Sequence, residues 1–165
     1  MIKEGSKYRI SKINYDGSKF FSKNEIDEII DIHPKDIYNP VKLRKNLKTL
    51  KYKYLRAGKL NISIFEDIIF DNNKVFVQIL ISEGITYFIR NTEISGLEEV
   101  DAKYIQRECL FTDGMIYDVK IINSTREQIF ESGLFSSVEI QPQIIDSSKI
   151  DLFRRLRIQA TGQGR

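Results

Sequence analysis

Hydrophobic positions in the first half of the chain follow two different spacings. Apolar residues that alternate with polar ones predict half-buried strands, whereas apolar residues three or four positions apart predict helices. Asp16-Gly17 and Asp71-Asn72-Asn73 interrupt these patterns with residue types that favour turns. The spacing predicts a strand over residues 8–15, helices over 22–31 and 40–56, and strands over 60–64 and 75–81.

The strongest helical pattern lies between Asn39 and Gly58. Asn39-Pro40 has the residue types of a helix cap and a first helical position, and Ala57-Gly58 is a typical end. Between them the apolar residues lie at i, i+4, i+7 and i+11, which places them on one face of a helix. The predicted buried stripe is Leu43, Leu47, Leu50 and Tyr54.

The second half of the chain repeats this pattern. Glu4-Gly5-x-x-Tyr8-x-Ile10 recurs 79 residues later as Glu83-Gly84-x-x-Tyr87-x-Ile89. Such a repeat indicates two copies of one structural unit. We therefore expect domains at 1–82 and 83–159, followed by a flexible tail at 160–165. The second copy is predicted to have a strand over 87–94, helices over 102–110 and 119–132, and strands over 136–144 and 150–158. The fold class is α+β, with two tandem βααββ domains.

Composition narrows the chemistry. The chain has 165 residues, of which 41% are hydrophobic and 30% charged, so a globular core is expected. Cys109 and His33 are the only cysteine and the only histidine, whereas a structural zinc site needs about four ligands. We expect Cys109 to be a small buried hydrophobic residue of a helix and His33, beside Pro34, to be a turn residue. The sequence predicts no cofactor and no enzyme.

Charge is unevenly distributed between the two halves. Residues 1–82 contain 16 Lys and Arg against 10 Asp and Glu, while residues 83–165 contain 10 against 13. The basic excess is concentrated in residues 42–56, which contain no acidic residue. No apolar run approaches the roughly 20 residues that span a bilayer, and the first residues lack the apolar core of a signal peptide. The sequence as given is therefore expected to be soluble.

Several short motifs occur in the same order in both halves. In the second half they are Glu83-Gly84-x-x-Tyr87, Ile94-Ser95-Gly96, Gly114-x-x-Tyr117 and the run Ser132-Gly133-Leu134-Phe135-Ser136-Ser137-Val138-Glu139-Ile140. This ordered set resembles the POTRA (polypeptide-transport-associated) domains of the Omp85 outer-membrane assembly proteins. The first half is similar through Glu4-Gly5-x-x-Tyr8, Tyr54-x-x-x-Gly58 and residues 60–64, but His33-Pro34-Lys35 stands where a glycine is usual.

The resemblance implies a fold, a location and a function. Each domain would be a three-stranded mixed sheet with two helices on one face, placed in the periplasm before a membrane barrel that this chain lacks. The partners would be unfolded outer-membrane proteins and accessory lipoprotein subunits. An edge strand can take up an extended chain by β-augmentation, and in the family the second strand of each domain is an edge. The predicted protein-binding residues are Leu60, Asn61, Ile62, Ser63, Ile64, Ser137, Val138, Glu139 and Ile140.

Two alternatives remain open from the sequence. The domains could belong to a two-partner secretion or organellar import homologue in the same family. In a different class, the basic helix over 41–56 could bind nucleic acid, although the chain has no Gly-x-x-Gly clamp and its second half is acidic. The same helix could instead dock an acidic partner or simply be a solvated face. The residues of this possible docking face are Lys42, Lys45, Lys48, Lys51 and Arg56.

Overall fold

The structure is a computed structural model that describes residues 7–95, 101–145 and 149–158, the last segment by its backbone alone. The chain divides into two compact units, Met1–Tyr54 with Asn61–Gly84 and Leu55–Leu60 with Ile85–Arg165. Each unit has the element order βααββ, which confirms the predicted α+β fold class. The tail predicted over 160–165 lies outside the described residues.

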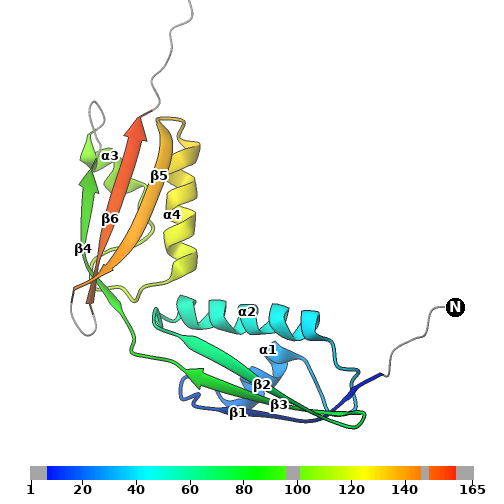
Figure 1. The fold of residues 1–165 in the computed structure, drawn as a ribbon. Helices are drawn as coiled ribbons and strands as arrows, with labels where there is room; N and C mark the ends of the chain where they lie inside the picture. Colours follow the sequence, from blue (N-terminus) through cyan, green and yellow to red (C-terminus); the bar gives the residue numbers. More distant parts are fainter. Residues whose placement is uncertain (1–6, 96–100, 146–148, 159–165) are drawn as a thin grey trace, which may run out of the picture. The chain divides into compact units, whose positions relative to one another are not determined.

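The first unit is a mixed three-stranded sheet packed against helices (Figure 1). The strand order is β1-β3-β2, with β1 parallel and β2 antiparallel to the central β3. Every second residue of β3 is buried, so the helices cover one face of the sheet and the other face is open. The elements are β1 (Arg9–Asp16), α1 (Lys23–Ile30), α2 (Pro40–Arg56), β2 (Ser63–Asp71) and β3 (Lys74–Ser82).

Local sequence explains where the two helices of the first unit begin and end. Ser22 and Glu25 form the reciprocal hydrogen bonds of a capping box at the start of α1. Asp31 ends α1 in a left-handed conformation with a φ of 44°. The Asn39 side chain accepts hydrogen bonds from two backbone N–H groups in the first turn of α2. The predicted apolar stripe of α2 is confirmed, because Leu43, Leu47, Leu50 and Tyr54 are all buried.

The repeated glutamate Glu83 has a structural role at the end of the first unit. Its buried Oε1 accepts hydrogen bonds from the backbone N–H groups of Lys19 and Phe20, both at 2.7 Å. The Tyr54 hydroxyl donates to the same oxygen at 3.2 Å. Burial raises the pKa of this hydroxyl to about 12, and the Glu83 charge acts in the same direction. The carboxylate therefore ties the end of the unit to the loop before α1.

The second unit repeats this topology. Its strand order is β4-β6-β5, with β4 parallel and β5 antiparallel to the central β6. The helix predicted over 102–110 is shorter in the structure and ends at Arg107. The buried residues of the second unit include Tyr87, Ile89 and Ile122 in one cluster and Ile105 and Phe135 in another. The elements are β4 (Phe88–Ser95), α3 (Ala102–Arg107), α4 (Val119–Glu131), β5 (Phe135–Ile144) and β6 (Lys149–Ile158).

The sequence repeat corresponds to a repeat of backbone hydrogen bonds. The Ile10 carbonyl accepts from the N–H of Lys35, and 79 residues later the Ile89 carbonyl accepts from the N–H of Gly114, each at 2.7 Å. Both donors are left-handed, with φ of 79° at Lys35 and 84° at Gly114. Glycine adopts this conformation without the strain that a side chain brings. Lys35 thus stands where the second unit has Gly114, and it keeps the same left-handed backbone shape.

Candidate functional site

The edge strand of the first unit lies further along the chain than predicted. The expected strand covered residues 60–64, but β2 runs from Ser63 to Asp71. Leu60 and Asn61 are in a turn, where the Leu60 N–H donates to the Gly58 carbonyl, and Ile62 is buried ahead of the strand. The chain must turn after α2 before it can pair with β3, so the first alternating residues are used in that turn.

Backbone groups along β2 are available for pairing with another strand. The two-residue turn Asn72-Asn73 joins Asp71 to Lys74, which are register partners. A turn of this length closes with a hydrogen bond between its flanking residues, so the odd-numbered residues of β2 bond to β3. The N–H and C=O groups of the even-numbered residues then point away from the sheet. We call these groups the free edge of β2, and they belong to Ile64, Glu66, Ile68 and Phe70.

The two faces of β2 have different neighbours. Glu66 is the register partner of Ile79, whose buried side chain lies on the helix side of the sheet. Phe65 pairs with Leu80 on the opposite side, where both are exposed, Phe65 to 65%. Side chains at alternate positions share a face, so an apolar surface covers part of the uncovered side of the sheet. This open face comprises Phe65, Ile69, Phe76 and Leu80, with the polar register pair Asp67 and Gln78 between them.

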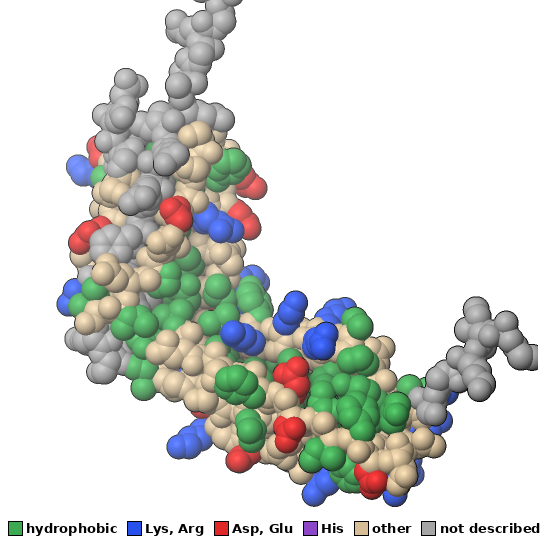
Figure 2. Space-filling view, in the orientation of Figure 1, with side chains coloured by type: hydrophobic (Ala, Val, Ile, Leu, Met, Phe, Trp, Pro, Cys, Tyr) green, Lys and Arg blue, Asp and Glu red, His purple; other side chains and the backbone are tan. Residues whose placement is uncertain are grey.

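A groove of about 250 Å³ separates β2 from α2. Its helix wall carries three positive charges at i, i+4 and i+7, the spacing of one helical face. Its strand wall carries the single carboxylate of Glu66. Figure 2 shows Lys and Arg side chains gathered over α2. The residues that line this α2–β2 groove are Arg44, Leu47, Lys48, Lys51, Ile64 and Glu66.

The structure separates the predicted basic docking face into groups with different surroundings. Lys48 and Lys51 line the α2–β2 groove, and Arg44, which sequence reasoning missed, lines it with them. Lys45 is exposed but does not line the groove. The i, i+4, i+7 spacing of Arg44, Lys48 and Lys51 was the signal in the sequence that could have identified this row.

The remaining two residues of the predicted docking face are already paired. The Lys42 ammonium lies 2.9 Å from a carboxylate oxygen of Asp31, and its hydrogen bond and charge lower the pKa of that exposed carboxyl. Arg56 belongs to the segment Leu55–Leu60 of the second unit, where its Nε lies 3.4 Å from Asp118 Oδ2. The charges of Lys42 and Arg56 are therefore partly neutralised.

The second unit also has an edge strand, and the predicted residues Ser137–Ile140 lie within it. β5 is at the edge of the sheet, beside β6 only. Val138 and Ile140 are half-buried. The alternate positions carry short or polar side chains that are all exposed, namely Ser137, Glu139, Gln141 and Gln143.

Pro142 interrupts the edge of β5. It is the register partner of Leu152, so the strand continues through it. Proline has no N–H, and in a paired strand it fits where that N–H would face away from the neighbour. The outward-facing groups are therefore those of Val138, Ile140, Pro142 and Ile144, and Pro142 has no donor. β5 offers an extended chain fewer main-chain hydrogen bonds than the free edge of β2.

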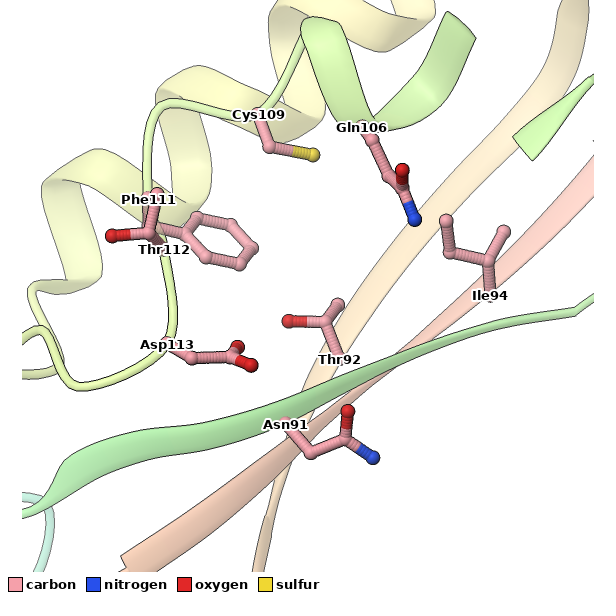
Figure 3. Close-up of a pocket in the computed structure, with 8 residues that line it drawn as sticks. All are labelled: Asn91, Thr92, Ile94, Gln106, Cys109, Phe111, Thr112 and Asp113. Carbon is pink, nitrogen blue, oxygen red and sulfur yellow. The ribbon is translucent and has the colours of Figure 1, made fainter. Parts of the chain in front are cut away.

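A second hollow, of about 310 Å³, lies in the second unit between β4 and the end of α3 (Figure 3). Cys109 lies beyond α3 rather than within a helix, and it is half-buried, so the predicted buried helical position was wrong. Its thiol donates a hydrogen bond to the Ile105 carbonyl at 2.9 Å. Most of the lining is polar and open to solvent. The lining residues are Asn91, Thr92, Ile94, Gln106, Cys109, Phe111, Thr112 and Asp113.

The other residue considered for chemistry, His33, lies where the sequence predicted. It is exposed in a turn, in which its carbonyl accepts a hydrogen bond from the N–H of Asp36 at 3.1 Å. Within the described ranges, no three His, Cys, Asp or Glu side chains are grouped closely enough to hold a metal ion. None of the helices in the described ranges is both long enough and apolar enough to cross a membrane.

The fold and the edges define the class of this protein as a tandem βααββ repeat with exposed edge strands. Residues 8–84 match the family model POTRA, described as surface antigen variable number repeat. The chain is 24% identical over 165 residues to the outer membrane protein assembly factor BamA of Buchnera aphidicola subsp. Acyrthosiphon pisum, covering 98% of this chain and 27% of that protein. It is 27% identical over 112 residues to the BamA of Neisseria meningitidis serogroup B, covering 66% of this chain and 14% of that protein.

Solved structures agree with this fold. A crystal structure of BamA POTRA3-5 from Haemophilus influenzae matches with a TM-score of 0.72 at 15% identity, covering 92% of this chain and 61% of that one. BamA from Haemophilus ducreyi lacking POTRA domains 1-3 matches with a TM-score of 0.80 at 14% identity, covering 92% and 30%. The first unit therefore matches the POTRA family model, and the chain as a whole is similar in sequence to BamA and in fold to its POTRA domains. It spans about a quarter of the length of the Buchnera protein.

Proposed function

We propose that the two units are periplasmic POTRA domains of an outer-membrane protein assembly factor. In this role they bind unfolded outer-membrane proteins as extended chains and accessory subunits through their helix faces, without catalysis. The function named for the Buchnera and Neisseria relatives supports the assembly role. The free edge of β2 beside the α2–β2 groove is the observation that supports binding by strand addition.

Strand addition suits a partner whose sequence varies. Main-chain hydrogen bonds supply affinity, and they do not depend on which side chains the added strand carries. β2 is 9 residues long and presents N–H and C=O groups at every second residue, so it can pair with a segment of similar length. A scaffold of this kind would hold many different unfolded proteins in one conformation.

Backbone amide NMR tests the proposal with a peptide that copies one strand of an outer-membrane barrel protein. We expect the peptide to shift the amides of Glu66 and Ile68 and to leave the helix α1 unchanged. The matched variants are Glu66→Pro, which removes an outward N–H, and Glu66→Ala, which keeps it. Glu66→Pro should weaken peptide binding more than about tenfold, because it loses main-chain hydrogen bonds and adds the bulk of the proline ring. Glu66→Ala should not show this loss.

Position 66 is suited to this test because its side chain is exposed and its N–H is not used inside the sheet. A proline at the buried Ile62 would disturb the core instead. Circular dichroism of both variants verifies that the sheet is intact. A folded Glu66→Pro protein that binds the peptide as tightly as Glu66→Ala contradicts strand addition at β2.

A further inference from the structure

We infer that the α2–β2 groove binds preferentially those extended chains in which acidic and apolar side chains alternate. This inference rests on the proposed strand addition at β2 and names the class of segment that this edge takes. Two observations support the inference: the charges of the groove and the apolar residues of the open face lie on opposite sides of the same strand.

The position of an added strand follows from sheet geometry. It would lie about 4.8 Å from β2 and would continue the pleat of the sheet. One row of its side chains would stand beside Glu66 and face α2, and the other row would stand beside Phe65 and Ile69 on the open face. Alternate residues of the partner therefore meet two different environments.

The row that faces α2 meets a positive surface. Arg44, Lys48 and Lys51 line this side of the helix, and Glu66 is the one carboxylate among the lining residues. Among the residues that the structure describes, none of the three cations forms an ion pair, whereas Lys42 on the same helix is paired with Asp31. Acidic side chains in the added row would pair with these cations, and basic ones would be repelled.

The row on the other side meets the exposed apolar residues Phe65 and Ile69, which flank the carboxylate of Asp67. Phe65 is 65% and Ile69 58% exposed, and Leu80 beside them is also exposed. A strand at the edge would cover part of Phe65 and Ile69, and each covered area of apolar surface favours binding. Polar residues in this row would gain no such contribution. An alternating acidic and apolar segment therefore matches both rows at once.

The experiment compares three peptides of equal length that alternate valine with glutamate, glutamine or lysine. Affinity is measured by fluorescence anisotropy on the full chain at about 0.1 M and about 1 M salt, where the screening length falls from roughly 10 Å to 3 Å. We expect the order glutamate, glutamine, lysine, with about tenfold between the first and the last at the lower salt. The difference should shrink at the higher salt.

The double variant Lys48→Glu/Lys51→Glu should reverse the order of the glutamate and lysine peptides. Lys45→Glu is the matched control, because it changes the charge of the same helix at an exposed position outside the groove, and the order should persist. The neutral variant Lys48→Gln/Lys51→Gln should reduce the preference without reversing it. It keeps the test decisive if the charge reversal disturbs folding.

The outcomes separate this inference from the proposed function. If all three peptides bind with equal affinity and shift the amides of β2, strand addition stands and the charge preference is wrong. If none of them binds, the proposed function fails as well. A single-stranded oligonucleotide that binds through Lys48 and Lys51, and displaces the glutamate peptide, would show a phosphate-binding surface and overturn the inference.

Discussion

The antiparallel edge strands, β2 in the first unit and β5 in the second, occupy the same place in the same fold but present different surfaces. β2 has no proline, an apolar face at Phe65 and Ile69, and a basic groove beside it. β5 has a polar face and contains Pro142. The strand order of a sheet decides which strands are at its edges, but the residues of an edge strand decide whether it can pair with another chain.

Exposed edges are a hazard, because they can pair with any extended chain. Proteins reduce that hazard with prolines, charges and polar faces, and β5 carries both a proline and polar residues such as Glu139. β2 also carries charges, at Glu66, Asp67 and Asp71, but it has no proline, and it lies in the half that carries the basic excess. We expect the first unit to provide most of the binding and the second to provide less.

The largest effect on stability should come from the position at which the two units share a left-handed backbone but carry different residues. Gly114 is left-handed with open space around its missing Cβ, and Lys35 has the same conformation in the first unit. Gly114→Ala should destabilise the second unit by about 1 kcal/mol, and Lys35→Gly should stabilise the first by about 0.5–1 kcal/mol. Urea unfolding followed by amide signals of each unit measures both changes.

Lys35→Ala is the control for the loss of the lysine side chain, because it retains the Cβ and hence the strain. It should leave the stability of the first unit close to that of the original chain. If Lys35→Ala stabilises as much as Lys35→Gly, the left-handed backbone is not the cause.

A smaller effect is expected from Pro142→Val. This change restores an outward N–H to β5, and one added hydrogen bond corresponds to about a threefold gain in affinity for a strand at that edge. Amide shifts in β5 during a peptide titration report the gain, and those in β2 serve as an internal reference. If the variant is folded and the β5 shifts remain weak, the missing N–H of Pro142 does not explain the difference between the two edges.

The smallest effect on binding is expected from Lys42→Met, which changes the paired side of α2. Without the ammonium, the pKa of Asp31 should rise toward its ordinary value, as measured by carboxyl NMR titration. A lowered pKa stabilises the fold above the unfolded pKa of about 3.9, and that contribution is lost as the pH falls through the folded value. Lys42→Met should remove this acid dependence, and peptide affinity should stay unchanged. A loss of affinity would extend the binding surface beyond the groove.

Most of the fold could be predicted from the sequence. The capping box at Ser22 and the apolar stripe of α2 are local signals, the 79-residue repeat is a direct comparison of two segments, and each was confirmed. Predicted boundaries were wrong at the start of β2 and the end of α3, where the packing of the chain rather than its local pattern sets the bounds. β2 begins at Ser63 because the preceding residues turn the chain, and α3 ends at Arg107.

The candidate site could be predicted only in part. The resemblance indicated that the second strand is an edge, and the strand order agrees. The groove was not predictable, because its walls come from α2 and β2, and the basic residues of α2 divide between paired and unpaired positions only when α1 and β2 are in place. Lys42 and Lys48 look alike in the sequence, but Asp31 lies beside one and Glu66 opposite the other.

The sequence alone determined that this protein is two copies of one βααββ unit, since periodicity and caps depend on neighbouring residues and the repeat is visible in the order of residues itself. Its motifs, which recur in order, also indicated the family that the chain resembles. Only the tertiary structure decided which backbone groups of β2 face outward and which cations share a groove with them. Those features depend on the register between strands and on the packing of a helix over a sheet, which bring together residues distant in the chain.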